Sequence, residues 1–129
     1  MTQQDKELLL RDLCYRSPYG VICQITFDKE DIHIESLESV RPFMTFNQIT
    51  TIGSVVSIEN VKPYLRPISS MTDEEVKEYN ALFYIHLDGE TYCENWEWMD
   101  WMNAHHFDYR DLLEKDLAIE VTKENNPYE

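Results

Sequence analysis

The sequence predicts an α+β fold: an N-terminal helix, then a small antiparallel SH3-like barrel or meander, then C-terminal helices and a hairpin packed on it. Three observations predict this fold: leucines at helical spacing near the start, β-rich runs after them, and helix-capping residues in the second half. The 129 residues, 43% of them hydrophobic, suit a single domain with a substantial core. The domain divides into a helix and turn (1–18), a β-rich part (19–67), a helical and hairpin part (68–121) and a polar tail (122–129). We expect the tail to fray.

The first predicted element is a helix over residues 4–14. Its apolar side is formed at spacings of three and four residues by Leu9, Leu10, Leu13 and Cys14. Asp12 is expected away from that side. The run Ser-Pro-Tyr-Gly at 17–20 then predicts a turn that ends the helix.

The β-rich part contains short runs in which Val, Ile and Thr dominate, as strands prefer. The runs that predict strands are 21–27, 32–37, 43–50 and 55–61, with a charged turn at 28–31. Two prolines follow, at 63 and 67, and they predict that residues 61–67 leave the sheet along an extended path.

Residue 72 begins the part of the chain with the clearest local signals. Thr72 and Glu75 have the spacing of a capping box, which predicts a helix start. Val76, Tyr79 and Phe83 are predicted to share the packed face of that helix. The runs 84–87 and 90–93 flank Asp-Gly at 88–89, a strong signal for a β-hairpin.

The remaining elements are predicted to be two short helices and a strand. Asn95 is expected to cap a helix whose packed face carries Trp98, Trp101, Met102 and His105. Asp108 is expected to cap a second helix, which directs Leu112, Leu113 and Leu117 inward. Residues 118–121 predict a final strand.

Charge is distributed unevenly along the chain. Residues 1–70 carry 7 Lys and Arg against 9 Asp and Glu, whereas residues 71–129 carry 4 against 16. The net charge is therefore −2 in the first part and −12 in the second, which also holds all three tryptophans. Such a surface repels nucleic acid and anionic membranes and attracts basic partners.

We expect the acidic residues after Thr72 to lie mainly on the surface and to form a binding site for a basic protein. The expected exposed acids are Asp73, Glu74, Glu75, Glu78, Asp88, Glu90, Glu94, Glu97, Asp100, Asp111, Glu114 and Asp116. Trp96 is out of phase with the packed tryptophans, and exposed aromatics are enriched in interfaces. The candidate partner-binding residues are Glu74, Glu78, Glu94, Trp96, Glu97, Asp100, Asp111 and Glu114.

Catalytic and metal-binding signals are weak. His105, His106 and Asp108 suggest a small metal-dependent enzyme, but adjacent histidines point to different sides of a helix or strand, and metal sites need three or four convergent ligands. The cysteines, at 14, 23 and 93, have no metal-ligand spacing and are typical of reduced thiols in the cytoplasm. We therefore predict no catalytic residues, metal or cofactor, no secretion signal and no membrane span.

A second interpretation assigns binding to the β-rich part. A small barrel can bind a peptide through exposed aromatics or accept a partner strand at its edge. The candidate aromatics are Tyr19, Phe43, Phe46 and Tyr64. In that case the acidic charge would be incidental.

Three sequence blocks together resemble a group of small proteins from Bacteroides-type gut bacteria and their phages and mobile elements. The blocks are 61–72, VKPYLRPISSMT; 8–14 with 18–21, LLLRDLC and PYGV; and 103–113, NAHHFDYRDLL. Residues 24–58 match poorly. The resemblance implies the cytoplasm of a bacterium or its phage, and a role in regulation, DNA handling or evasion of host defence. It brings no activity and no catalytic residues.

The chain departs from that group at two positions. The group tends to have glycine where this chain has Asp111 and Asp116. Both changes add negative charge to the acidic part. Together with the charge distribution, the resemblance leads us to expect a non-enzymatic, acidic interaction module, an inhibitor that occupies the basic nucleic-acid-binding surface of another protein.

Overall fold

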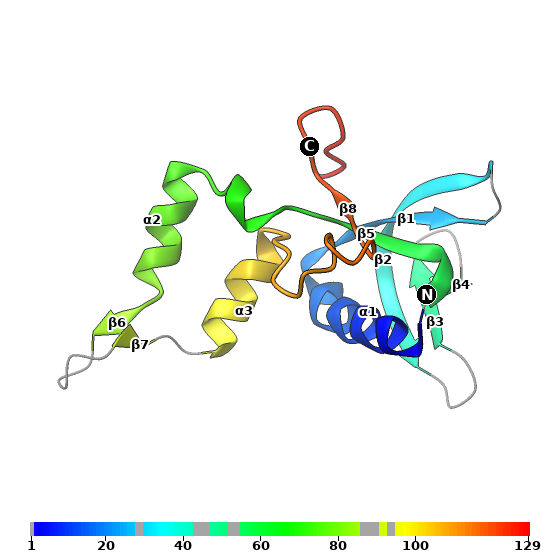
Figure 1. Ribbon diagram of the computed structural model, residues 1–129, viewed down its shortest axis with the longest axis horizontal. Helices are drawn as coiled ribbons and strands as arrows, with labels where there is room; N and C mark the ends of the chain where they lie inside the picture. The colour runs from blue at the N-terminus through cyan, green and yellow to red at the C-terminus, as the bar shows by residue number, and fades with distance from the viewer. Residues whose placement is uncertain (1, 28–29, 43–46, 52–54, 86–90, 93–94) are drawn as a thin grey trace.

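The computed structural model describes residues 2–129 except 28–29, 43–46, 52–54, 86–90 and 93–94. It has an α+β fold, as the sequence predicts, with an N-terminal helix and further helices after the sheet (Figure 1). The sheet has the strand order β4-β3-β2-β1-β5-β8. Its strands are β1 (Ile22–Thr26), β2 (Ile32–Pro42), β3 (Asn47–Thr51), β4 (Val55–Ser57), β5 (Val61–Leu65) and β8 (Ile119–Glu120).

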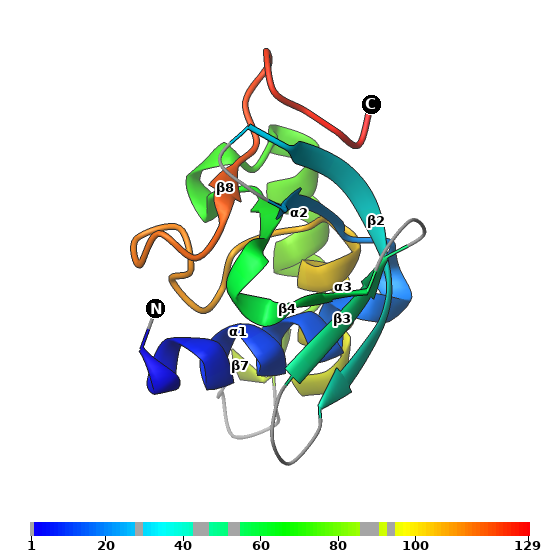
Figure 2. The same cartoon turned by 90° about the vertical axis from the view of Figure 1, so that its right-hand side faces the viewer.

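The first four strands form an antiparallel meander, which confirms that part of the prediction. A 3₁₀ turn, η2 (Ile58–Asn60), reverses the chain so that β5 returns to pair with β1. Figure 2 shows how strongly β2 curves, which wraps the meander around one side of the molecule. β8 then adds to β5 in the parallel sense.

The prediction that residues 61–67 leave the sheet is wrong for 61–65, which form β5. Pro63 lies opposite Cys23 in the register with β1. A proline is tolerated in a strand where its missing N–H is not needed. In the described part of the chain β8 pairs with β5 only from Tyr64 onward. The missing N–H of Pro63 therefore costs no backbone hydrogen bond to β8.

The helix α1 (Gln3–Arg16) packs against the sheet and closes the core. Its buried leucines are Leu9 and Leu13, and the core around them includes Val21, Cys23, Ile25, Val61, Leu65, Leu112 and Leu117. A capping box of Thr2 and Asp5, which the sequence reading missed, starts the helix. Asp12 was expected away from the packed side, but it is fully buried.

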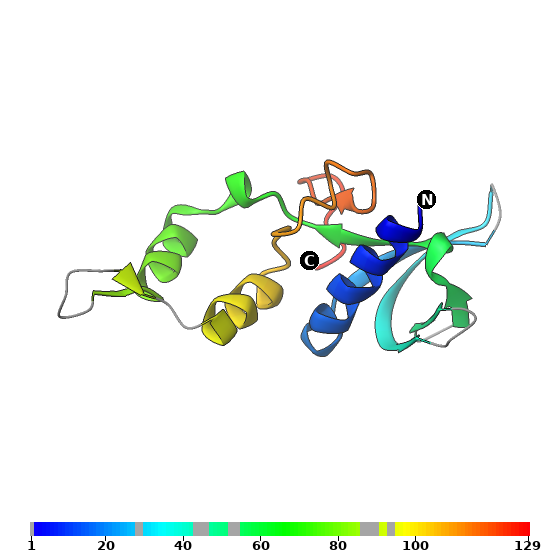
Figure 3. The ribbon, with the colours of Figure 1, turned by 60° about the horizontal axis from the view of Figure 1, so that its bottom comes forward.

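Residues 68–104, here called the arm, extend away from the sheet. The arm contains the 3₁₀ turn η3 (Ile68–Ser70), α2 (Asp73–Ala81), β6 (Tyr84–Ile85), β7 (Thr91–Tyr92) and α3 (Asn95–Ala104). Figures 1 and 3 both show α3 between α2 and α1. The predicted capping box of Thr72 and Glu75 is present, and β6 pairs with β7 as the hairpin predicts. The predicted turn residues, Asp88 and Gly89, lie outside the described residues.

The segment after Asp108 differs from its prediction because it forms turns instead of a helix. The Asp108 carboxylate still caps backbone amides, accepting from Leu112 N and Leu113 N at 3.0 Å each. Asp111 and Asp116 have φ angles of +59° and +58°, which an α-helix does not contain. Aspartate tolerates this left-handed region better than most residues, and glycine adopts it freely.

The prediction that residues 122–129 fray is also wrong at one residue. The Tyr128 hydroxyl bonds to the backbones of both β1 and β5. No helix in the described part of the chain is long and apolar enough to cross a membrane.

Candidate functional site

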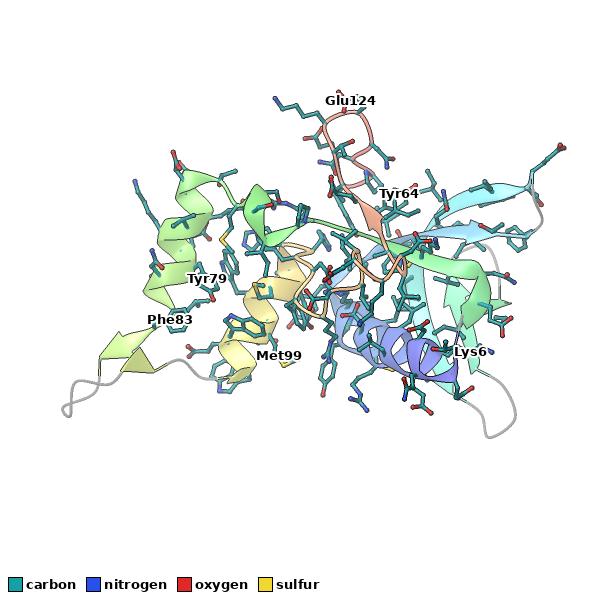
Figure 4. The ribbon with its side chains drawn as sticks, in the orientation of Figure 1. Lys6, Tyr64, Tyr79, Phe83, Met99 and Glu124 are labelled. Atoms are coloured by element: carbon teal, nitrogen blue, oxygen red, sulfur yellow. The ribbon has the colours of Figure 1, made fainter. Side chains whose placement is uncertain are left out.

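The predicted acidic residues of α2 divide between two sides of the helix. Asp73, Glu74 and Glu78 are exposed, and no ion pair involving them is found among the described residues. Tyr79 and Phe83 point from the opposite side toward α3 (Figure 4). Val76 was predicted to pack with them, but it is 41% exposed. Glu74 and Glu78 therefore stand together on a surface that faces solvent.

Glu75 was predicted to be exposed, but it is only 8% exposed and anchors the arm. Its carboxylate accepts two hydrogen bonds from the Arg66 guanidinium, at 2.7 and 2.8 Å. The Nδ1 atom of His105 lies 3.0 Å from the same carboxylate. The Arg66 hydrogen bonds, and the bonds of the Thr72 cap, lower the Glu75 pKa to about 2. The sequence placed Glu75 correctly as a cap, but that signal carries no information about Arg66.

The predicted residues of α3 lie on different sides of that helix. Trp96 is 63% exposed, the largest exposed fraction among the large apolar side chains that the structure describes. The Asp100 carboxylate accepts a hydrogen bond from the Tyr19 hydroxyl, and Asn103 donates to the Tyr15 carbonyl at 3.4 Å. Glu97 is half-buried. Trp98 and Trp101 are half-buried, and both contact Tyr79 of α2.

Of the remaining candidates, Asp111 and Glu114 lie on the turns that follow the arm. Asp111 and Glu114 line a hollow of about 260 Å³ together with Ile68 and Glu120. Asp116 pairs with Lys62 at 3.2 Å. Glu94, like Asp88 and Glu90, lies outside the described residues. The structure thus brings Glu74 close to Glu78 and Asp111 close to Glu114, on separate elements.

His105 and His106 line a groove of about 840 Å³, together with Arg66, Thr72 and Tyr128. Burial, with the nearby charges of Arg16 and Arg66, lowers the His106 pKa to about 4, so the ring is neutral at pH 7. The Asp108 carboxylate is engaged by backbone amides instead. No group of three or more metal-binding side chains occurs within the described ranges.

A buried ion network joins α1 to the turn segment, and the sequence reading missed it. Arg16 and Asp12 are both 0% exposed, and Arg16 Nε donates to Asp12 Oδ2 at 2.6 Å. Arg16 Nη2 also donates to the Phe107 carbonyl at 2.7 Å. Arg110 Nε lies 3.3 Å from Asp12 Oδ1, without the geometry of a hydrogen bond. The i,i+4 spacing of Asp12 and Arg16 was the available signal.

The aromatic residues of the second interpretation are not gathered on one surface. Tyr64 is buried, at 3% exposure, and Tyr19 is bonded to Asp100. Phe43 and Phe46 lie outside the described residues. Three other apolar side chains are exposed near the β1–β2 turn: Phe27, Ile32 and Ile34, at 42%, 51% and 57%.

Comparisons with known proteins give no relative from which a role can be transferred. No family model matches the chain. No curated protein and no solved structure matches it either.

Proposed function

We propose that this protein is a non-enzymatic interaction module whose arm binds a basic surface of another protein. One observation carries the proposal: α2 holds Asp73, Glu74 and Glu78 toward solvent without ion-pair partners among the described residues. Glu74 and Glu78 are four residues apart on the helix, a spacing at which like charges repel each other. A basic partner would offset them on binding.

The packing of α2 supports this proposal because it limits how the acids are presented. Glu75 is tied to Arg66 at one end of the helix. Further along, the Tyr79 hydroxyl accepts a hydrogen bond from Trp98 Nε1 at 3.2 Å, and its ring meets Trp101 edge-on. Preorganised charges lose less conformational entropy on binding than charges on a loop.

Trp96 is the natural aromatic contact for a basic partner. Its side chain is on α3, in the same arm, and is 63% exposed. Indole faces attract arginine and lysine cations by about 0.5–1 kcal/mol at exposed sites. A basic partner that engages the α2 acids and also reaches Trp96 would therefore gain both charge pairing and aromatic contact.

We further propose that the partner surface normally binds nucleic acid, and that the protein acts as a phage or mobile-element inhibitor in the bacterial cytoplasm. The net charge of −12 after residue 70 supports this, because acidic side chains can substitute for phosphates. The sequence resemblance to proteins of mobile elements supports the setting. The same charge disfavours nucleic acid and anionic membranes as direct ligands.

The test compares two variants that change the net charge equally. Glu74→Lys with Glu78→Lys alters α2, whereas Glu7→Lys with Glu124→Lys alters exposed positions outside the arm. After pull-down from a bacterial host, the captured protein is purified and titrated with each variant at 50 and 300 mM salt. The proposal predicts at least a tenfold loss for the α2 variant and a smaller loss for the control, with affinity falling as salt rises.

Equal losses in the two variants would contradict a specific role for α2 and indicate attraction by net charge alone. Binding that is unchanged by salt would contradict the electrostatic basis. A nucleic acid that fails to compete for the captured protein would reject the inhibitor part of the proposal only.

A second candidate function is the binding of a peptide or partner strand by the sheet. The three exposed apolar side chains near the β1–β2 turn favour it. Replacement of Ile32 and Ile34 by Ser separates the two proposals, because it removes exposed apolar area and leaves the charge unchanged. A partner that is lost in this variant and kept by the α2 charge reversal would support the sheet as the binding site.

A further inference from the structure

Residues 122–129 form a loop that Tyr128 joins to the sheet by hydrogen bonds (Figure 1, the red segment at the top). Residues 122–125 are exposed. The bonds between Thr122 and Asn125, and that from the Tyr128 amide to Asn126, stay within the loop. Among the described residues, the hydrogen bonds that tie this loop to the rest of the molecule are the two made by the Tyr128 hydroxyl.

The Tyr128 hydroxyl takes the place of a rung in the sheet. The β1–β5 register runs from Ile25 opposite Val61 to Cys23 opposite Pro63, so the next position sets Ile22 opposite Tyr64. There the Ile22 amide donates to the Tyr128 hydroxyl at 3.1 Å, and the hydroxyl donates to the Tyr64 carbonyl at 2.7 Å. One donor and one acceptor of the backbone are thus bridged by a phenol.

The Tyr128 ring lies flat on His106. The two ring centroids are 3.7 Å apart and the planes differ by 8°. Two backbone hydrogen bonds hold His106 in place. Its carbonyl accepts from the Arg66 amide at 2.8 Å, and its amide donates to the Asn103 carbonyl. The backbone at His106 has a φ of +62°, in the left-handed region that residues other than glycine adopt uncommonly.

Both rings are neutral, which suits parallel stacking. The His106 pKa is lowered to about 4, so the imidazole carries no proton charge at pH 7. Burial raises the pKa of Tyr128, so its hydroxyl keeps the proton that it donates to Tyr64.

We propose that the slot between Ile22, Tyr64 and His106 is a recognition site for a tyrosine side chain. Tyr128 occupies it as an internal ligand, and a tyrosine-containing peptide segment of another protein replaces it. The slot offers a donor, an acceptor and an aromatic face, and a phenol satisfies all three. Phenylalanine would leave both backbone groups unpaired, and tryptophan can donate but cannot accept.

The groove beside the slot has room for the peptide around such a tyrosine. It measures about 840 Å³, and its walls include Arg66, Thr72 and His105 as well as Lys123 and Asn126 of the loop. Displacement of the loop would widen the groove on the side formed by Lys123 and Asn126. Glu75 lines this groove, but the exposed acids of α2 do not, so the site is independent of the function proposed above.

The experiment uses the full chain with Tyr128→Ala, which empties the slot, and N-acetyl-tyrosinamide as the probe. NMR titration follows the Ile22 amide and the His106 ring. We expect N-acetyl-tyrosinamide to shift both signals and to bind at least tenfold more tightly than N-acetyl-phenylalaninamide. Wild-type protein should bind the tyrosine probe at least tenfold more weakly than the variant, because Tyr128 competes.

Tyr128→Phe provides the second variant, since it keeps the stack and removes the bridge. It should bind the tyrosine probe more tightly than wild type does, whereas Tyr15→Phe, a change at an exposed tyrosine outside the groove, should bind as wild type does. Equal binding of both probes, or no gain in affinity in Tyr128→Phe, would overturn the proposal. A wild-type dimer that dissociates on Tyr128→Phe would also overturn it, in favour of exchange of residues 122–129 between two copies.

Discussion

The body, meaning residues 2–67 together with 105–121, contains acidic side chains that are paired with basic ones, whereas, among the described residues, the exposed acids of α2 in the arm are not. In the body, Asp12 is buried against Arg16, Glu59 pairs with Lys6, and Asp116 pairs with Lys62. In the arm, the exposed acids of α2 have no such partners in the part of the chain that the structure describes. The one buried acid of α2, Glu75, is paired with Arg66 of the body.

This difference teaches that the sequence position of an acid says little about its role. Glu74 and Glu75 are neighbours with the same side chain, yet one faces water and the other holds the arm to the body. Charges that are buried and paired support the fold, because loss of one partner leaves the other charge uncompensated. Charges that are exposed and unpaired are free to act between molecules.

The largest expected effect comes from the buried network of the body. Arg16→Met would leave the Asp12 carboxylate and the Phe107 carbonyl without their donor in a fully buried site. We expect a loss of about 3–5 kcal/mol in the free energy of unfolding. Urea unfolding measures it, with Arg11→Met, an exposed position on the same helix, as a control expected within about 0.5 kcal/mol. A loss below about 1 kcal/mol at Arg16 would show that the network contributes little to stability.

The next largest effect is the difference in stability between variants of the two neighbouring glutamates, Glu74 and Glu75. Glu75→Gln should cost about 2–3 kcal/mol, because it weakens two charge-assisted bonds to Arg66 and the bond to the Thr72 amide. Glu74→Gln should change stability by less than about 0.5 kcal/mol. Thermal unfolding of the two variants in parallel checks the comparison. Similar losses in both would remove the distinction between anchoring and exposed acids.

Acidification should reveal the same anchor. The Glu75 pKa is about 2 in the folded protein, below its ordinary value of 4.5. A lowered pKa contributes stability that is present above pH 4.5 and is lost as the pH falls toward 2, by about 3 kcal/mol at most. The stability difference between wild type and Glu75→Gln should therefore shrink from pH 5 to pH 2.5. Asp12 and His106 also titrate, but they are present in both proteins. A difference that stays constant would contradict the assignment.

The sequence predicted those features whose causes are local. The capping box at Thr72, the leucines of α1, the four-stranded meander and the β6–β7 pairing all follow from spacing and propensity within a few residues. The fifth strand was missed because Pro63 argues locally against a strand, whereas its place beside β1 is set by tertiary pairing.

The candidate site was harder to predict because its decisive contacts join distant residues. Arg66 and Glu75 are nine residues apart, and Tyr128 meets Ile22 across 106 residues. Periodicity and capping rules consider only residues within a few positions of each other, so they do not predict such contacts. The exposure of Trp96 could be predicted, because its phase on α3 differs from that of Trp98 and Trp101.

The smallest expected effect tests whether an exposed pair in the body resembles the buried network or the arm. The Asp116 side chain is 90% exposed and lies 3.2 Å from Lys62 Nζ. Asp116→Asn removes the charge but keeps a residue that tolerates the φ of +58°, so we expect a loss of about 0–0.5 kcal/mol. Asp116→Ala should cost about 1 kcal/mol more, because alanine is strained in that region. Urea unfolding of both variants checks this order. An Asn variant as damaging as the Ala variant would assign the cost to the ion pair, and exposed charges of the body would then support the fold as the buried ones do.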